Sequence, residues 1–422
     1  MFKRVLVATD FSRHTDRVLE CIGEIPGMEE IILLHVQTGE DTVPPARLLE
    51  KKEHHLAPLG IPVRSLLVES EYGDIVRGIT GTATRERASI IVMGARGRNL
   101  LRTLVLGSVS KGVIGTSTTD VLVLHFRGED APATENLEVY CQNIFFRILC
   151  PVDFSKPTAD VLAFLPGLPV VREVIFLHVL PVPAQGEDRE ILETQTARKL
   201  DKLKSAPGIS ARRVRTVVRH GDPAEEIVAC AEEEDVSLTL ISRYGRGDYA
   251  TNIPLGSTAA GVAARAQRPL LVRYPRIHLD VEARELSSGE FDRAETVWLG
   301  YHQQKADRNT DRIFGVFVEG ALAAVARCRR HPEGLEVDGV FVGEQFRNRG
   351  YARKAVQALV AACGTGILYM YSTLPLVTFY SSFGFAPIAE RELPESIRAR
   401  FDFAAGNLKG ANAVPMRRLP TD

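Results

Sequence analysis

RVLVATDFS, at Arg4–Ser12, returns as RILCPVDFS at Arg147–Ser155, an offset of 143 residues. Further matches follow in the same order along the chain. IILLHV returns as VIFLHV, YGDIVRGI as HGDPAEEI, and Gly107-Ser108 as Gly256-Ser257. Matches that keep their order over a whole domain length indicate a duplication. The chain is therefore predicted to open with two copies of one domain.

Each copy alternates short β-branched runs with longer segments of helical periodicity. In the first copy the runs are VLVAT, IILLHV, VRSLLVES, SIIVMG and VLVLHF. This alternation predicts a doubly wound parallel sheet, and the uniformly apolar runs fit strands that helices cover on both faces. Ligands of such folds bind outside the carboxyl ends of the strands. We therefore expect the functional residues just after the strands.

The length of 422 residues exceeds what one hydrophobic core usually supports. We expect three domains: residues 1–126, a linker at 127–143, a second copy at 144–275, and a different domain at 277–422. The net charge of -1 gives no electrostatic reason to expect nucleic acid or a membrane surface as the main partner. No apolar run reaches the length of a membrane span and no leader is evident, so we expect a cytoplasmic protein.

The six cysteines are scattered, with no C-x-x-C pair and no histidine spacing typical of zinc. We expect them to be small packed side chains, with no disulfide and no metal site.

Glycines mark the end of the fourth run of the first copy. GARGRNLLRTLVLGS, from Gly94, places Gly97 after two residues and Gly107-Ser108 after nine more, ahead of a helical segment. Glycines let backbone N–H groups approach phosphate, and a helix N-terminus adds unpaired donors and a favourable dipole. Three arginines of the same loop bring positive charge: Arg96, Arg98 and Arg102.

This spacing, with Asp10 after the first strand, closely resembles the universal stress protein family, whose fold is that of the adenine nucleotide alpha hydrolases. Members with the G-x2-G-x9-G-[S/T] pattern bind ATP. The resemblance therefore implies an ATP site, with Mg²⁺ as an ion that could accompany the nucleotide. Its residues would be Asp10, Val36, Gly94, Gly97, Gly107, Ser108, Val109 and Ser110. The alternative is that the glycines and Asp10 only shape the turns of the fold.

The second copy departs from the pattern. Ser242 replaces the first glycine, and ten residues instead of nine separate Gly245 from Gly256-Ser257. A side chain then stands where close backbone approach was needed. We therefore expect this copy, although it keeps Asp153, to be mainly structural. The resemblance also implies that the two copies pair as an intrachain pseudo-dimer, and a homodimer of the whole chain stays open.

The pattern changes near Arg276, and the remainder predicts a mixed α/β domain. We expect strands at VWLGYH, RIFGVFVEG, ALAAVARCRR and LEVDGVFV, a helix from Gly350, a strand at GILYMYS, a short helix, and a last strand near AVPMRRL. Arg347 to Ala352 (RNRGYA) begin the helix, where N–H groups and arginines suit a pyrophosphate. FYSSFGF follows at Phe379–Phe385.

These two motifs, in this order, resemble the GNAT acyltransferase superfamily. The resemblance implies an acetyl-CoA site at Val342, Arg347, Asn348, Arg349, Gly350, Tyr351 and Ala352. It also implies that Tyr380 protonates the departing thiolate and that Glu336 acts as general base, with Asp338 as the rival base. Cys363 is expected to be a core residue rather than a nucleophile.

The leading hypothesis is an acetyl-CoA-dependent N-acetyltransferase that ATP binding to the tandem regulates. The acceptor would be an amine, either a small molecule or a protein lysine. The alternative is a sensor that binds ATP and CoA without turnover. An ATPase is disfavoured because no Walker loop is present.

Overall fold

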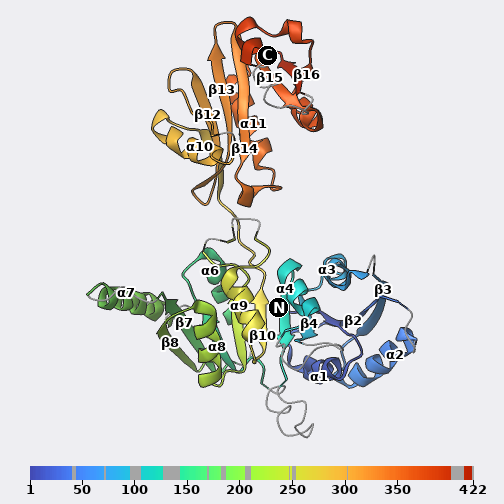
Figure 1. Ribbon diagram of the computed structural model, residues 1–422. Helices are drawn as coiled ribbons and strands as arrows, with labels where there is room; N and C mark the ends of the chain where they lie inside the picture. The colour runs from blue at the N-terminus through green and yellow to red at the C-terminus, as the bar shows by residue number, and fades with distance from the viewer. Residues whose placement is uncertain are drawn as a thin grey trace. The chain divides into compact units, whose positions relative to one another are not determined.

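The computed structural model describes residues 1–39, 44–70, 73–95, 106–126, 143–168, 171–181, 187–204, 211–246, 248–249, 253–301, 303–400 and 413–420. The chain divides into two compact units. The first comprises Met1–Tyr249 and Ile253–Ile277, and the second consists mainly of His278–Asp422. Figure 1 shows the elements of both units.

The first unit is built on one ten-stranded sheet of order β3-β2-β1-β4-β5-β10-β9-β6-β7-β8. The strands of the first copy are β1 Arg4–Ala8, β2 Glu30–Gln37, β3 Val63–Glu69, β4 Ile90–Gly94 and β5 Asp120–Leu124. Those of the second are β6 Arg147–Pro151, β7 Glu173–Leu180, β8 Arg213–His220, β9 Leu238–Ser242 and β10 Leu270–Arg273. Strands within each copy pair in parallel, whereas β5 and β10 pair antiparallel. The predicted doubly wound fold is confirmed, and the two copies share one sheet.

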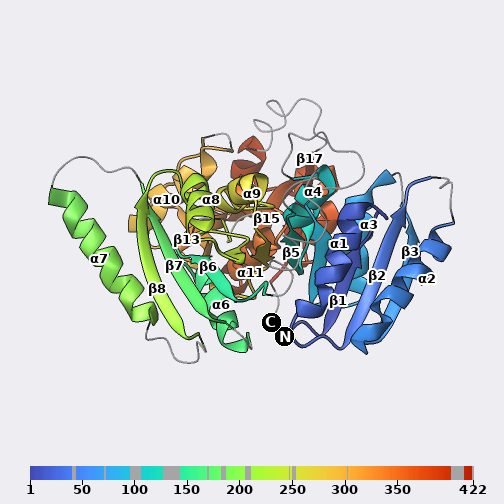
Figure 2. The same cartoon turned by 90° about the horizontal axis from the view of Figure 1, so that it is seen from below.

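Helices cover both faces of this sheet. The helices are α1 Arg13–Cys21, α2 Pro45–Leu56, α3 Ile75–Arg85, α4 Ser108–Thr116, α6 Lys156–Phe164, α7 Glu187–Lys204, α8 Pro223–Glu233 and α9 Ser257–Arg265. One hydrophobic core includes residues of α1, α2 and α6, and a second core on the other face includes residues of α3, α4, α8 and α9. Figure 2 shows α7 beside the outer strand β8. Each core runs through both copies, because the shared sheet is continuous.

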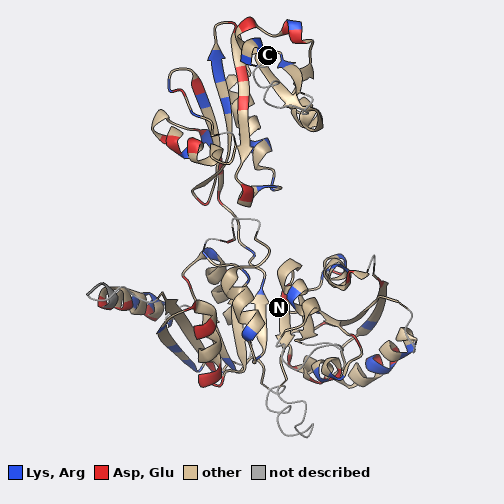
Figure 3. Cartoon of the chain, viewed as in Figure 1, with Lys and Arg blue, Asp and Glu red and all other residues tan. Residues whose placement is uncertain are grey.

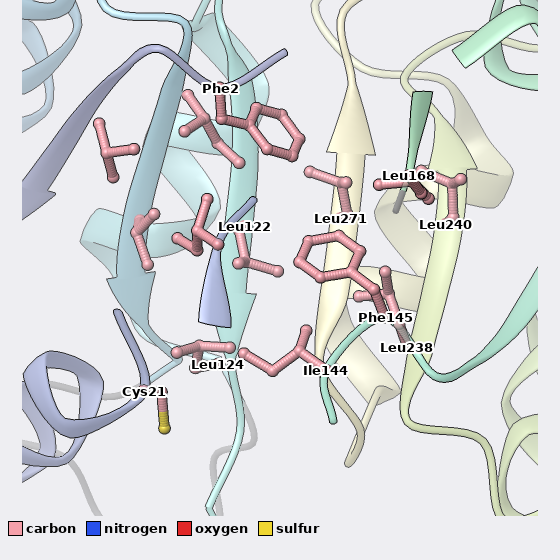
Figure 4. Packing of buried hydrophobic residues seen from close by; sticks show 14 of the residues in the cluster. Phe2, Cys21, Leu122, Leu124, Ile144, Phe145, Leu168, Leu238, Leu240 and Leu271 are labelled. Atoms are coloured by element: carbon pink, nitrogen blue, oxygen red, sulfur yellow. The ribbon is translucent and has the colours of Figure 1, made fainter. Parts of the chain in front are cut away.

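The seam between the copies combines apolar residues with a buried ion pair. Leu122 on β5 pairs with Leu271 on β10, and Figure 4 shows both within the buried cluster. Arg273 on β10 donates to Asp120 on β5 at 2.8 Å, and both side chains are buried. Burial raises the pKa of Asp120, and Arg273 opposes that increase.

The second unit is a seven-stranded sheet of order β11-β12-β13-β14-β15-β17-β16. Its strands are β11 Val281–Glu285, β12 Asp311–Val318, β13 Ala321–His331, β14 Gly334–Val342, β15 Leu368–Thr373, β16 Ala386–Pro387 and β17 Ala413–Arg418. All neighbours pair antiparallel except β14 and β15, which pair in parallel. Its helices are α10 Phe291–Trp298, α11 Tyr351–Cys363 and α12 Val377–Ser381. The predicted mixed α/β domain is confirmed.

Two sequence-based expectations are wrong. VWLGYH is not a strand, because Val297 and Trp298 end helix α10, whose Phe291, Ala294 and Trp298 are buried at helical spacing. Cys21 is disulfide-bonded, and its partner lies outside the described residues. Spacing along the sequence does not reveal which cysteines the fold brings together. None of the described helices combines the length and the hydrophobicity that a membrane span requires, and no three metal-ligating side chains cluster among the described residues.

Candidate functional site

The carboxyl ends of β1, β2 and β4 lie side by side in the first copy, because these strands are neighbours in the order β2-β1-β4. Asp10 follows β1, and its Oδ1 accepts hydrogen bonds from Ser12 N at 3.0 Å and Thr15 Oγ1 at 2.7 Å. Val36 lies near the end of β2 and Gly94 ends β4. The sheet thus brings together three of the predicted nucleotide residues.

The turn after β1 has a shape that the sequence did not reveal. Phe11 takes a left-handed φ of 60°, and its ring packs on His35 with 4.3 Å between the centroids. His35 Nδ1 donates to Thr9 O at 2.8 Å. His35 therefore fixes the loop that carries Asp10.

Helix α4 begins at the end of β4 without a side-chain cap. Its N-cap is Gly107, in an extended conformation, and Gly107 N donates to Ala95 O at 2.7 Å. Ser110 Oγ donates to Gly94 O at 3.0 Å, which ties the helix start to the strand end. The first N–H groups of an α-helix have no intrahelical partner, so an uncapped start suits an anion. Gly97 and the three loop arginines lie outside the described residues.

The second copy repeats the turn and changes the loop. Asp153 Oδ1 accepts from Ser155 N at 3.0 Å and Phe154 has a φ of 59°, as in the first copy. His178 Nδ1 lies 2.6 Å from Val152 O. Ser242, by contrast, ends β9 as a buried residue where the first copy has glycine. The turn is duplicated while the loop has diverged.

Strands β14 and β15 in the second unit pair over only two residues, Leu335 with Leu368 and Glu336 with Tyr369. Both strands continue, to Val342 and Thr373, without further pairing to each other. Gly343 N donates to Ala323 O on β13, and successive N–H groups of a strand point to opposite edges. The Val342 N–H therefore points to the edge of β14 along which β15 is no longer paired. There the carbonyl oxygen of an acyl group could accept a hydrogen bond from it.

A loop with left-handed residues joins β14 to α11. Asn348 has a φ of 62° and Gly350, the N-cap of α11, a φ of 77°. No side chain caps this helix, and a Cβ on Gly350 would meet no atom within 4 Å. The N–H groups of the first turn, which includes Tyr351 and Ala352, therefore have neither an intrahelical acceptor nor a side-chain cap. Arg347 and Arg349 belong to the same loop, so the predicted residues form one basic helix start.

Glu336 lies in a buried charged cluster on the sheet face opposite α11. Figure 3 shows basic residues on β13 beside acidic residues on β14. Glu336 is 0% exposed, and its Oε2 lies 2.8 Å from His331 Nε2 and 2.9 Å from Arg400 Nε. Its Oε1 is buried without a hydrogen-bond partner. Burial raises the pKa of Glu336, Asp338 adds to the increase, and Arg400 and His331 oppose it.

Asp338 is held differently. Arg327 donates to it with Nε and, at 2.7 Å, with Nη2, and Arg400 donates at 3.0 Å. Both oxygens of Asp338 are thus engaged by guanidinium N–H groups, whereas Glu336 Oε1 has no described partner. Asp338 is therefore a weaker candidate for proton transfer than Glu336.

Tyr380 is buried on α12, among Phe379 and Phe385. Burial raises its pKa, so the phenol keeps its proton at neutral pH. Cys363 is buried at the end of α11, within the hydrophobic core of this unit.

Comparison with known families decides the identity of the tandem. The model of the universal stress protein family matches residues 1–125 and 145–273. The chain belongs to the universal stress protein family. The model of the acetyltransferase (GNAT) family matches residues 279–385, so this universal stress protein carries a C-terminal GNAT domain.

Relatives resemble the chain in parts. A universal stress protein of Mycolicibacterium smegmatis is 28% identical over 203 residues, which are 45% of this chain and 63% of that protein. A universal stress protein of Methanocaldococcus jannaschii is 24% identical over 154 residues, 31% of this chain and 94% of that protein. The crystal structure of a universal stress protein from Archaeoglobus fulgidus aligns with a TM-score of 0.45 and 24% identity, covering 64% of this chain and 98% of that one.

Sequence reasoning missed two partners of Glu336 in this universal stress protein. His331 faces it across the β13–β14 hairpin, where His331 pairs with Gly334, and a prediction of that hairpin would have placed the two side chains together. Arg400 lies 64 residues away from Glu336 in a helical segment, residues 395–400. No local pattern signals that contact.

Proposed function

We propose that the protein is an acetyl-CoA-dependent N-acetyltransferase that acts on an amine, either a small molecule or a protein lysine. The observation that carries the proposal is the combination of the separated strands β14 and β15 with an uncapped helix start at Gly350. The first provides backbone N–H groups for an acyl group, and the second provides donors for a pyrophosphate.

In the proposed reaction the amine nitrogen attacks the thioester carbon while Glu336 takes a proton from the amine. The N–H of Val342 stabilises the charge that develops on the carbonyl oxygen. The C–S bond then breaks, and Tyr380 gives its proton to the departing thiolate. The products are an amide and free CoA. A raised pKa suits both groups, since the base must hold a proton and the acid must keep one until it is needed.

The test compares acetyl transfer by Tyr380→Phe and Tyr369→Phe across a panel of amines. Both changes remove one hydroxyl from a buried tyrosine of the same domain. Loss of a general acid costs about 10² to 10⁴ in rate, so Tyr380→Phe should lose at least about 100-fold in kcat. Tyr369→Phe should stay near the wild type. Equal rates for both variants would remove Tyr380 from the mechanism.

We also propose that ATP binds the first copy at Asp10, Val36, Gly94, Gly97, Gly107, Ser108, Val109 and Ser110. The uncapped start of α4 beside the end of β4 supports this site. When bound, ATP would place its phosphates against these backbone N–H groups. We infer that nucleotide binding regulates the acetyltransferase, since one chain carries both sites. Equal CoA affinity with and without ATP would contradict this regulation.

One observation favours a second candidate function, a sensor without turnover. Both Arg400 and His331 engage Glu336, so the base is ion-paired in this structure. A sensor would bind ATP and CoA and release no thiol in the presence of any amine.

A further inference from the structure

The second copy contains a cavity at the carboxyl ends of β6, β7 and β9. Its volume is about 130 Å³, many times the roughly 10 to 15 Å³ that a cavity needs to hold one water. Pro151, Leu177, Ile227 and Ile241 are among its apolar walls, and Asp153 and His178 are among its polar groups. An apolar cavity with a few convergent polar groups is the usual form of a small-molecule site.

Two polar side chains of this cavity, Asp153 and His178, can accept hydrogen bonds from a ligand. Asp153 Oδ1 is engaged by Ser155 and Thr158, whereas no described donor reaches Oδ2. Burial lowers the pKa of His178, which favours the neutral ring. Its Nδ1 must donate to the Val152 carbonyl, which can only accept, so Nε2 is left as an acceptor. A ligand with amino or hydroxyl donors would match both groups.

An acidic side chain lies beside two glycines of the second loop. Asp248 Oδ2 is 2.8 Å from the position that a Cβ on Gly256 would take, and 3.8 Å from the corresponding position on Gly245. Gly256 is the N-cap of α9, which no side chain caps by a hydrogen bond. A carboxylate thus lies at the helix start that would otherwise attract an anion.

The loops of the two copies differ in charge accordingly. From Ala95 to Gly107 the first loop contains three arginines and no acidic residue. In the second loop, Arg246 is exposed, and its guanidinium donates at 2.7 Å to the backbone oxygen of Asp153, a residue that lines the cavity. Asp248 opposes any phosphate that Arg246 would attract.

We propose that the second copy binds an uncharged nucleoside or nucleobase and rejects its phosphorylated forms. The inference rests on the proposed nucleotide role of the first copy. The second copy would be a duplicate that kept the part of the site that binds the base and lost the part that binds the phosphates. The cavity volume suits one flat ring system, and the two acceptors suit its amino and hydroxyl groups.

The test titrates adenosine into the full chain in the presence of saturating ATP, by calorimetry. The expected result is one further adenosine per chain, with ATP itself binding at a single site. No adenosine binding under ATP saturation, or two ATP molecules per chain, would overturn the proposal. A third outcome separates this inference from the proposed ATP site: ATP does not bind, one adenosine binds, and Asp153→Asn abolishes the adenosine binding. That outcome refutes the ATP site of the first copy and supports the inference for the second copy.

A charge variant tests the reason for the selectivity. Asp248→Asn removes the negative charge at the start of α9, so AMP should bind the second copy at least about tenfold more tightly, with adenosine unchanged. Asp201→Asn, an exposed aspartate on α7, is the matched control. Unchanged AMP affinity in Asp248→Asn would contradict the proposed rejection of phosphate. These measurements are repeated in Asp10→Asn, which weakens the proposed ATP site of the first copy, so that binding to the second copy can be distinguished.

Discussion

Replacing Arg400 by glutamine should move the acidic limb of the pH–rate profile for acetyl transfer upward by about one pH unit. Arg400 Nε lies 2.9 Å from Glu336 Oε2 and lowers the pKa of that carboxyl against the effect of burial and of Asp338. Removing the positive charge therefore raises the pKa of Glu336. Because a general base acts only when it is deprotonated, the rate then rises to its plateau at a higher pH.

The magnitude follows from the exposure of the ion pair. A guanidinium in contact with a carboxylate lowers its pKa by about 1 to 3 units. Arg400 is 37% exposed while Glu336 is 0% exposed, so solvent screening favours the lower end of that range. Arg327 still holds Asp338 after the substitution, and His331 still contacts Glu336. A shift of one unit means about a tenfold lower kcat/KM on the acidic limb, with the plateau retained.

The assay is kcat/KM for one amine between about pH 5 and 9, a range that covers a carboxyl with a raised pKa. Arg398→Gln is the matched control, since Arg398 lies in the same helical segment, 395–400, and has no described side-chain partner. Glu336→Gln should abolish the acidic limb of the pH–rate profile. This variant distinguishes titration of Glu336 from titration of the amine, which would leave the limb in place. An unchanged limb in Arg400→Gln, or a shift to lower pH, would refute the assignment of Glu336 as the base.

Three further predictions concern the nucleotide site, the seam and the CoA loop. Asp10→Asn keeps an Oδ1 acceptor for Ser12 and Thr15 but loses the charge, so ATP affinity should fall about 10- to 100-fold by calorimetry, whereas Asp153→Asn should leave it unchanged. Arg273→Met leaves the buried Asp120 without its ion-pair partner and should lower the free energy of unfolding in urea by about 3 to 5 kcal/mol. The loss should be smaller at lower pH, where Asp120 gains a proton. The matched change at an exposed arginine, Arg265→Met, should cost under about 1 kcal/mol. Gly350→Ala and Gly320→Ala both place a Cβ in open space at left-handed φ and should each cost about 1 kcal/mol of stability, but only Gly350→Ala should weaken CoA binding. Equal ATP affinities, equal stabilities or equal CoA affinities within a pair would contradict the respective prediction.

Much of the first unit was predictable because its information is local and repeated. The runs around Val5, Ile31 and Ile90 are apolar throughout, as parallel strands covered on both faces must be. The antiparallel pairing of β5 with β10 was less accessible. It joins two edge strands from different copies, and edge pairing depends on complementary surfaces rather than on any local pattern.

In the second unit the motifs indicated the loop and Tyr380, but not the surroundings of Glu336. The periodicity of Phe291, Ala294 and Trp298 would have predicted α10, yet the β-branched and aromatic residues of VWLGYH favoured a strand. Arg400 reaches Glu336 only through the tertiary fold. Its contact could not be predicted from one sequence, because ion pairs between distant segments leave no spacing signal.

The proposed function depends on one reaction, the transfer of an acetyl group from acetyl-CoA to an amine by the GNAT domain. The most direct measurement uses the full chain with one amine at a time. It quantifies by mass both the CoA that carries a free thiol and the acetylated amine. We expect at least one amine for which the two products appear in a 1:1 ratio and for which Tyr380→Phe lowers both together. Thiol release that no amine increases, with no acetylated product from any amine or lysine peptide, would contradict it.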